Sequence, residues 1–297
     1  MNYSSLRFVG VLVALLVSAH AFAAPDTAVY ERIAKQVQQA DPNRVEMQEA
    51  LMSAVIRGEV GQVQSLLREG VDPNFSLNNA SHAKVDPRFS HPRGATPLMV
   101  AAAQKYQQNT EALLQRGAKV NVQLQGKGKT PLMFAAQKDR YSNIDLLLKA
   151  GAKADVTDET NVKWTALMYA ARQGNVTSVV HLLREVTPEN LRTPLNRTNP
   201  PMTRAELTKE YFVNLGDANG ATALYLAVIK EGNVNVIRNL LQAGADPLRT
   251  ANGTGRSPLS LAASYNEEEY LREMSKYLTP QQKEMPEVKD ILDMLEK

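Results

Sequence analysis

Short apolar runs of one composition recur along this chain, with polar loops between them. Each run begins with Thr or Ser, continues through Pro or Ala to Leu, and ends in small apolar residues. The clear copies begin at Thr96, Thr130, Thr165, Thr222 and Ser257. The intervals between these positions are 34, 35, 57 and 35 residues. A nearly fixed period of this length is the signature of a solenoid made of stacked structural repeats.

Each apolar run is predicted to be a short helix. The Thr or Ser hydroxyl suits a helix N-cap, because it can accept a hydrogen bond from a free backbone N–H of the first turn. Pro follows at the first helical position, where no N–H is needed, at Pro97, Pro131 and Pro258. The small residues at the end of the run allow close packing against neighbouring repeats.

A second helix is predicted later in each repeat. In the repeat that begins at Thr165, an apolar stripe has the spacing i, i+3, i+4 and i+7, at Val176, Val179, Val180 and Leu183. Glycines then supply the left-handed residue that commonly ends a helix, at Gly117, Gly151 and Gly244. The repeat is therefore predicted to be helix, turn, helix and a loop back to the next Thr.

Two phrases in the repeats resemble the ankyrin repeat family. Residues 130–136 resemble its Thr-Pro-Leu-His-x-Ala-Ala phrase, and residues 147–152 resemble its Leu-Leu-x-x-Gly-Ala phrase. The resemblance implies an all-α solenoid of helix-turn-helix repeats. The family's His is replaced throughout, by Met99, Met133, Met168, Tyr225 and Ser260. Because that His ties neighbouring repeats by polar contacts, we expect seams that rely more on apolar packing, to which thioethers adapt well.

About six repeats are expected over residues 46–278, and the first is a degenerate copy. Helical caps are predicted over 24–45, with a leader helix at 27–40, and over 279–297, because an open solenoid end needs covering. The last helix could equally bind a partner. Insertions at 75–93 and 187–219 break the period and are either binding loops or decoration. A capping box that starts at Thr203 predicts a helix through Phe212.

The first 23 residues have the pattern of a secretory signal peptide. Arg7 precedes an apolar core, and Ala21-Phe22-Ala23 is a small-residue cleavage site. The apolar run is too short to span a bilayer, so cleavage is favoured over a retained anchor. We therefore expect a periplasmic protein, with secretion as the alternative, and no membrane span after cleavage. Without Cys, the chain forms no disulfide and has no lipid-modified cysteine. The net charge of +3 is too small to indicate nucleic-acid binding.

No set of residues in the sequence predicts catalysis, a cofactor or a metal. His82 with Asp86 or His91 lacks the further ligands of a metal site, and His181 is expected to be a surface or partly packed residue. Residues 126–130 lack the spacer of a phosphate-binding loop, and their Thr is already an N-cap. Glu267, Glu268 and Glu269 are expected to be solvated at a helix start. We therefore expect no enzyme.

The resemblance also implies where a partner would bind. Ankyrin proteins typically use their finger tips and the exposed residues of the first helices. The matching positions are Lys127, Lys129, Gln137, Lys138, Lys163, Trp164, Arg172, Gln173, Lys230, Arg256 and Tyr265. These positions include no carboxylate, and Trp, Tyr and Arg are typical interface anchors. We therefore expect a concave basic strip that recognises an acidic protein surface; the alternative is that these charges only keep the array soluble.

Two functional hypotheses follow for a monomeric binding protein. The first is an adaptor that stabilises or regulates an envelope protein. The second is an immunity protein that neutralises a secreted toxin, which predicts much tighter binding. An enzyme that uses the two insertions is disfavoured, because no acid–base pair or nucleophile emerges from the sequence.

Overall fold

A computed structural model describes residues 42–76, 94–192 and 210–296 of the chain. The chain divides into two compact parts, Met1–Met47 and Gln48–Lys297. Of the first part, only residues 42–47 are described, and they belong to the beginning of a helix. The predicted signal peptide, the leader helix and most of the insertion at 75–93 lie outside the described residues. So does the middle of the insertion at 187–219.

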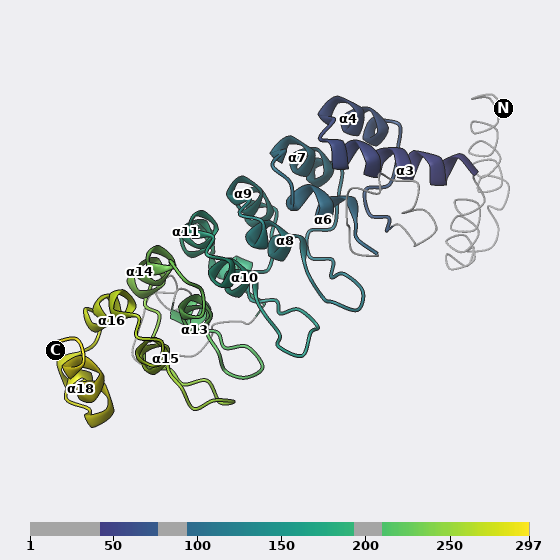
Figure 1. Cartoon of the computed structure of the whole chain (residues 1–297). Helices are drawn as coiled ribbons and strands as arrows, with labels where there is room; N and C mark the ends of the chain where they lie inside the picture. The colour runs from purple at the N-terminus through teal and green to yellow at the C-terminus, as the bar shows by residue number, and fades with distance from the viewer. Residues whose placement is uncertain (1–41, 77–93, 193–209, 297) are drawn as a thin grey trace. The chain divides into compact units, whose positions relative to one another are not determined.

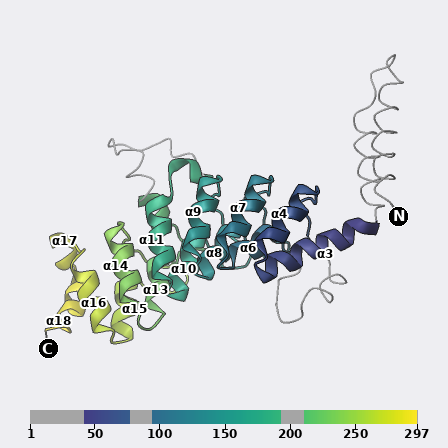
Figure 2. The same ribbon diagram turned by 90° about the horizontal axis from the view of Figure 1, so that it is seen from above.

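Pairs of helices are stacked side by side in the second part (Figures 1 and 2). We number the pairs as repeats 1 to 6 and name the first helix of each pair inner and the second outer. The pairs are α3 (Pro42–Arg57) with α4 (Val60–Arg68), α6 (Pro97–Ala102) with α7 (Gln107–Gln115), α8 (Pro131–Gln137) with α9 (Tyr141–Lys149), α10 (Ala166–Gln173) with α11 (Val176–Glu185), α13 (Ala223–Val228) with α14 (Val234–Gln242), and α15 (Pro258–Ser264) with α16 (Glu268–Ser275). From α6 to α15 each inner helix contacts the next, and from α4 to α16 each outer helix does the same. The predicted all-α solenoid is confirmed.

The repeated Thr starts the inner helices as predicted. The Thr130 hydroxyl accepts the N–H of Met133 at 3.3 Å, and equivalent caps form at Thr96, Thr165, Thr222 and Ser257. The residue that replaces the family's His completes a reciprocal cap, because the Thr130 N–H donates to Met133 Sδ at 3.4 Å. Thr165 and Met168 have the same relationship. Methionine therefore stabilises the helix start as well as filling space.

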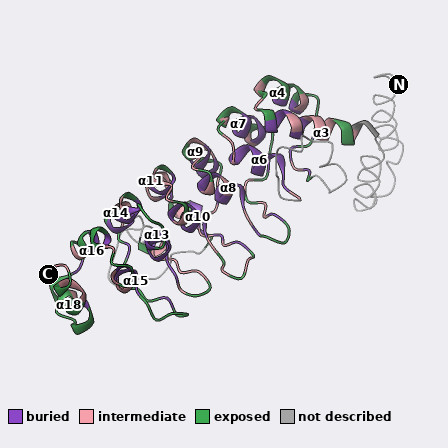
Figure 3. Cartoon of the chain, in the orientation of Figure 1, coloured by how far each residue is buried: buried purple, intermediate pink, exposed green. Residues whose placement is uncertain are grey.

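Apolar side chains between the two helix rows form the core (Figure 3). Inner helices α6 and α13 are buried along their whole length, and α10 is buried from Ala166 to Ala171. In outer helix α11, Val179 and Leu182 are the most deeply buried apolar residues, whereas Val176, Val180 and Leu183 are only half-buried. The buried stripe therefore differs from the predicted one in its last turn, where Leu182 rather than Leu183 is buried, because α11 also packs against α9 and α14.

Buried or half-buried asparagines link repeats 3, 4 and 5 to the repeat before each of them. Asn143 Nδ2 donates to the carbonyls of Ala101, Ala102 and Gln104 at 3.2, 3.0 and 2.8 Å. Asn175 does the same for repeat 3, and Asn233 for repeat 4. These bonds satisfy carbonyls that a helix C-terminus leaves without partners. The expectation of a mainly apolar seam was therefore incomplete: the methionines are buried, and asparagine provides polar ties.

A second set of polar ties joins the loops that follow the outer helices. Asn121 donates to Gly151 O at 3.1 Å and accepts the Lys153 N–H at 2.8 Å. Asn74 and Asn214 make the same pair of bonds to the loops that follow them. The left-handed glycines predicted at these helix ends are present, with φ of 80° at Gly117 and 91° at Gly244.

The described ends of the second insertion belong to this loop ladder. A 3-10 turn, η1 (Pro188–Asn190), returns to repeat 3, where Asn190 Nδ2 donates to Leu148 O and Ala152 O at 2.9 and 3.0 Å. Asn214 ends a helical stretch that includes Phe212, as predicted; its predicted start at Thr203 lies outside the described residues. The insertion therefore leaves and re-enters the array without breaking the register of the repeats.

The segment predicted as the C-terminal cap contains α17 (Pro280–Lys283) and α18 (Pro286–Asp293), and we keep that name for it. Val288 of α18 is buried, whereas much of the cap is exposed (Figure 3). At the other end, α3 runs across the predicted boundary between residues 45 and 46. In the described ranges, no helix combines the length and the apolar character that a span of the lipid bilayer requires.

Candidate partner-binding surface

Loops that we name fingers extend from the inner-helix side of the array (Figure 1). In the finger of residues 124–129, the Leu124 N–H donates to Lys129 O at 2.9 Å, and the fingers of residues 158–164, 217–221 and 251–256 close in the same way. Neighbouring fingers also bond to each other: the Glu159 N–H donates to Lys127 O at 3.1 Å, and the Ala218 N–H donates to Val162 O at 2.9 Å. The fingers of repeats 3 to 5 are therefore a connected surface.

Each finger needs a left-handed residue two positions before its N-cap. Glycine takes this position at Gly94, Gly128, Gly220 and Gly255, with φ from 64° to 78°. At Gly128 the reason is also steric, because a Cβ atom would lie 2.2 Å from the Glu159 nitrogen. Lys163 takes the same position in repeat 4 with φ of 56°, a conformation that strains a residue with a Cβ. Repeat 4 therefore carries an exposed lysine where its neighbours carry glycine.

Lys129 is held inside the surface by the next repeat. Its Nζ lies 4.1 Å from the centroid of the Tyr169 ring and donates to Gln137 Oε1 at 3.1 Å. Burial lowers the pKa of Lys129, and the negative charge of Asp158 partly opposes this effect. A cation over an aromatic face is attracted by the ring quadrupole.

Asp158 is the centre of the finger of repeat 4. Its buried carboxylate accepts hydrogen bonds from the Tyr169 hydroxyl at 2.5 Å and from the Thr160 hydroxyl at 2.5 Å. The Trp164 N–H donates to the same carboxylate at 3.3 Å. Burial and the bond to Asp158 raise the pKa of Tyr169 above its usual range.

Trp164 joins this finger to the next one. Its Nε1 donates to Asp217 Oδ2 at 3.2 Å, and its ring meets the Tyr169 ring edge-on at 5.3 Å. The expectation of a strip without carboxylates therefore needs a correction. Folding brings Asp158 and Asp217 to two of the predicted residues, Lys129 and Trp164, which consequently serve to fix the fingers.

The other predicted residues keep side chains open to solvent. Those that are exposed are Lys127, Lys138, Lys163, Gln173, Lys230, Arg256 and Tyr265; Arg172 and Gln137 are half-buried. In the ranges described, no ion pair involves a finger, an inner helix from α6 onward or the turn that follows it. Lys105 is a further exposed cation, in repeat 2. The sequence pattern did not predict it, because Lys105 stands one position later in its repeat than Lys138 does. Carboxylates also occur here, at Glu159, Glu231 and Glu267.

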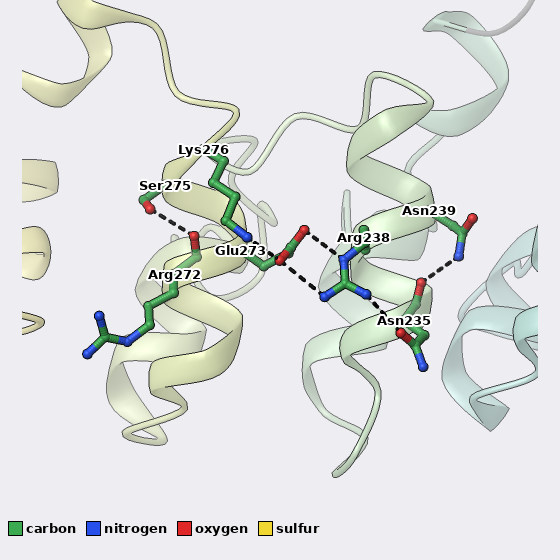
Figure 4. Close-up of polar contacts among 7 residues, drawn as sticks. All are labelled: Asn235, Arg238, Asn239, Arg272, Glu273, Ser275 and Lys276. Atoms are coloured by element: carbon green, nitrogen blue, oxygen red, sulfur yellow. Dashed lines mark hydrogen bonds and ion pairs between the residues drawn. The ribbon is translucent and has the colours of Figure 1, made fainter.

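Charged side chains of the outer helices, by contrast, form ion pairs within the chain. Glu273 of α16, 5% exposed, accepts hydrogen bonds from Arg238 Nε at 3.0 Å and from Lys276 Nζ at 2.8 Å (Figure 4). These bonds hold the pKa of Glu273 below its ordinary value. His181, half-buried as expected, lies 2.8 Å from Asp145. Polar contacts between outer helices thus tie repeat 5 to repeat 6 and repeat 3 to repeat 4.

Within residues 42–76, 94–192 and 210–296, no group of three or more His, Asp and Glu side chains is placed to hold a metal ion. His82, Asp86 and His91, considered above as metal ligands, lie outside them. The geometry defines a repeat scaffold whose fingers and inner helices present a continuous surface.

The chain belongs to the ankyrin repeat family. The family model described as ankyrin repeats in three copies matches residues 20–124, 51–158, 120–193, 152–251 and 196–285. Members of this family are protein-interaction modules and are generally non-enzymatic scaffolds. No curated protein matches the chain in sequence.

Several solved structures share this fold. The human ASB11 ankyrin repeat domain is 21% identical, with a TM-score of 0.56 over 83% of this chain and 97% of that one. The ankyrin repeat protein EF0377 is 21% identical, with a TM-score of 0.55 over 78% and 98%. A chain in the complex of the predatory endopeptidase Bd0816 from Bdellovibrio bacteriovorus with the immunity protein Bd3460 is 25% identical, with a TM-score of 0.53 over 76% and 97%.

Proposed function

We propose that this protein is an exported adaptor or regulator that binds a partner protein with an acidic surface through its fingers and inner helices. The observation that carries the proposal is a set of cations on that face that form no ion pair with any described residue: Lys127, Lys138, Lys163, Arg172, Lys230 and Arg256. Complementary charge across an interface speeds association and gives specificity.

Lys163 adds a second line of support. Glycine would relieve the strain at this position, as it does in the neighbouring fingers. Strained residues persist where the surrounding structure holds them, and they cluster at functional sites. A lysine ammonium at the finger tip is the benefit that would offset the strain.

The N-terminal 23 residues support export, and we propose a periplasmic location, with secretion as the variant. A fusion of residues 1–30 to a reporter enzyme that is active only outside the cytoplasm tests this step. Activity of the fusion, lost when Arg7 and the apolar core are replaced, is the expected result. An inactive fusion would mean that the partner must be sought in the cytosol.

Affinity capture tests the binding proposal. Mature protein is used to capture its partner from the host's periplasmic extract, alongside a variant with Lys127→Glu, Lys138→Glu and Arg172→Glu. A matched control carries Arg68→Glu, Arg116→Glu and Lys149→Glu, three exposed cations on the outer side. The partner should be retained by the control and lost from the test variant. Equal capture by both variants would refute the basic face as the binding site.

The second candidate is an immunity protein, and a specific observation favours it. One chain with this fold comes from the complex of an endopeptidase with an immunity protein. Deletion of the gene decides between the two roles. If the protein is an immunity protein, its deletion leaves the host poisoned by the host's own secreted enzyme, and co-deletion of that enzyme restores growth. An adaptor gives only a conditional defect that no second deletion restores.

A further inference from the structure

The binding face has an edge where each inner helix turns into its outer helix. We name it the turn edge and define it as the last two residues of each inner helix from α6 onward, together with the turn that follows. Two halves of this edge differ in chemistry. Repeats 3 and 4 place Lys138 and Arg172 there, whereas repeats 5 and 6 place Ile229 and Tyr265 there.

In the described ranges, the side chains of the cationic half form no ion pair with a carboxylate. The nearest one in sequence, Asp139, already accepts the Ser178 N–H at 3.0 Å and the Ser178 hydroxyl at 2.7 Å. Lys138 and Arg172 form no ion pair with a described residue, and Lys230 lies beside the turn that follows Arg172. A methyl group at Gly174, just after Arg172, would lie 3.8 Å from Lys230 Cγ. The three cations therefore follow one another along the edge.

The other half exposes apolar surface. Ile229 is 37% exposed and Tyr265 is 51% exposed, and they end the neighbouring inner helices α13 and α15. Among the described residues of the fingers, the inner helices from α6 onward and the turns after them, these are the exposed large apolar side chains. Tyrosine is enriched among the residues that dominate binding at protein interfaces, and Ile229 adds exposed apolar area to the same half of the edge.

Carboxylates lie in both turns of this apolar half. Glu231 is two residues after Ile229, and Glu267 is two residues after Tyr265. Burial raises the pKa of Tyr270, the bond with the Asn233 backbone opposes this, and the negative charges of Glu267, Glu269 and Glu231 add to the rise. Glu231 is exposed and Glu267 is half-exposed, and neither forms an ion pair among the described residues. A partner side chain seated here therefore meets an apolar surface with negative charge beside it.

The turn that carries Ile229 is held in place before any partner arrives. The Tyr270 hydroxyl donates to Lys230 O at 2.8 Å and accepts the Asn233 N–H at 2.9 Å. Asn233 in turn donates to Ala171 O and Ala227 O at 3.1 and 2.9 Å. A prearranged surface loses little conformational freedom on binding, which favours affinity.

We propose that the turn edge binds a partner segment of mixed chemistry in one orientation. Acidic side chains of that segment lie over Lys138 and Arg172, and an apolar side chain next to a basic one lies over Ile229 and Tyr265. This inference rests on the proposed function and adds to it the order of chemical groups along the partner. A uniformly acidic partner would leave the apolar half empty and face repulsion from Glu231 and Glu267.

Labelled synthetic peptides test this order by fluorescence anisotropy with the full mature chain. The complete probe has an Asp/Glu block, a Gly-Ser spacer and a Trp-Lys pair; two partial probes replace either block with Gly and Ser. One variant carries Lys138→Glu and Arg172→Glu, and another Ile229→Ser and Tyr265→Ser. Matched controls are Arg116→Glu with Lys149→Glu, and Met285→Ser with Met294→Ser, whose exposed side chains lie elsewhere.

The complete probe should bind at least about tenfold more tightly than either partial probe, because its two blocks are linked. The cation variant should weaken both probes that carry acid, and the apolar variant only the two that carry Trp-Lys. If the apolar variant binds the complete probe as the wild type does, the inference is wrong, while the basic face of the proposed function stands. If the cation variant changes no probe and the triple variant of the capture experiment keeps its partner, the proposed function itself fails.

Discussion

The ammonium group of Lys129 lies 4.1 Å from the centre of the Tyr169 ring, and the two residues belong to neighbouring repeats. The contact joins the finger of repeat 3 to the inner helix of repeat 4. The Tyr169 hydroxyl then continues to Asp158, and Trp164 continues to Asp217 in the next finger. The central fingers are therefore fixed by their own side chains, and the remaining exposed cations extend from a rigid base.

Tyr169→Phe tests this support. The substitution keeps the ring beneath Lys129 but leaves the buried Asp158 carboxylate without one of its donors. Loss of a hydrogen bond to a buried charged group should lower the free energy of unfolding by about 1–3 kcal/mol. Urea denaturation followed by circular dichroism measures the change. Tyr141→Phe, at a tyrosine that is 47% exposed, is the control and should be neutral. Equal stability of the two variants would contradict the supporting role.

Asn143→Ala tests the asparagine ties between repeats. Three carbonyls of repeat 2 lose the Asn143 donor in this variant, although Ala101 O keeps the Gln104 N–H. We expect a loss of about 2–3 kcal/mol, because buried carbonyls without partners are costly. Asn161→Ala, in an exposed part of the finger of repeat 4, should change stability by less than about 0.5 kcal/mol. A small effect at Asn143 would show that apolar packing, rather than the asparagine bonds, holds the seam.

Glu273 makes the junction of repeats 5 and 6 sensitive to acid. Its pKa is below the ordinary 4.5 because Arg238 and Lys276 donate hydrogen bonds to the ionised form. A depressed pKa contributes stability that is present above about pH 4.5 and is lost as the pH falls through the lower folded value. At pH 7, Glu273→Gln should lower the melting temperature by about 2–4 °C.

The difference between the wild type and Glu273→Gln should shrink as the pH falls below about 4.5. Melting curves of both proteins from pH 7 to pH 3 measure it. Glu284→Gln, at an exposed glutamate of the C-terminal cap, controls for the change of net charge. A difference that stays constant over this range would mean that the Glu273 charge does not couple the two repeats.

Lys163→Gly separates stability from binding. Glycine relieves the left-handed strain but loses more conformational entropy on folding, so we expect a change between neutral and about 1 kcal/mol more stable. Capture of the partner should nevertheless weaken, because the ammonium group is gone. Paired urea titrations and capture assays give both quantities. Lys283→Gly in the C-terminal cap is a control that should leave capture unchanged. If Lys163→Gly binds as well as the wild type, the strain has no role in recognition.

Much of the fold could be predicted from local signals. Thr130 and its counterparts mark helix starts and Gly117 marks a helix end, because caps depend on a few neighbouring residues. Element edges were less predictable where the chain departs from its period. Helix α3 runs through the expected boundary at 45/46, and the insertion is anchored through Asn190, whose partners lie 42 and 38 residues away.

The candidate surface was predictable only in part. Exposed Lys127, Lys138 and Lys230 follow from the register of the repeats alone. The register does not predict the roles of Lys129 and Trp164, because their partners depend on how neighbouring fingers pack together. Asp217, for example, lies 53 residues beyond Trp164. The asparagine ties were missed for another reason. Asn143 is the third residue of α9, whereas Asn175 is the N-cap of α11, so the spacing is not constant.

The central claim is that unpaired cations on the fingers and inner helices bind an acidic protein partner. Isothermal titration of the purified partner at low and high salt tests it most directly. Three proteins are compared: the wild type, the variant in which Lys127, Lys138 and Arg172 are replaced by Glu, and the outer-side control in which Arg68, Arg116 and Lys149 are replaced by Glu. The account predicts that the first reversal weakens binding at least about tenfold at low salt, with a smaller loss at high salt, while the control binds like the wild type. Equal affinities for all three proteins at low salt would contradict it.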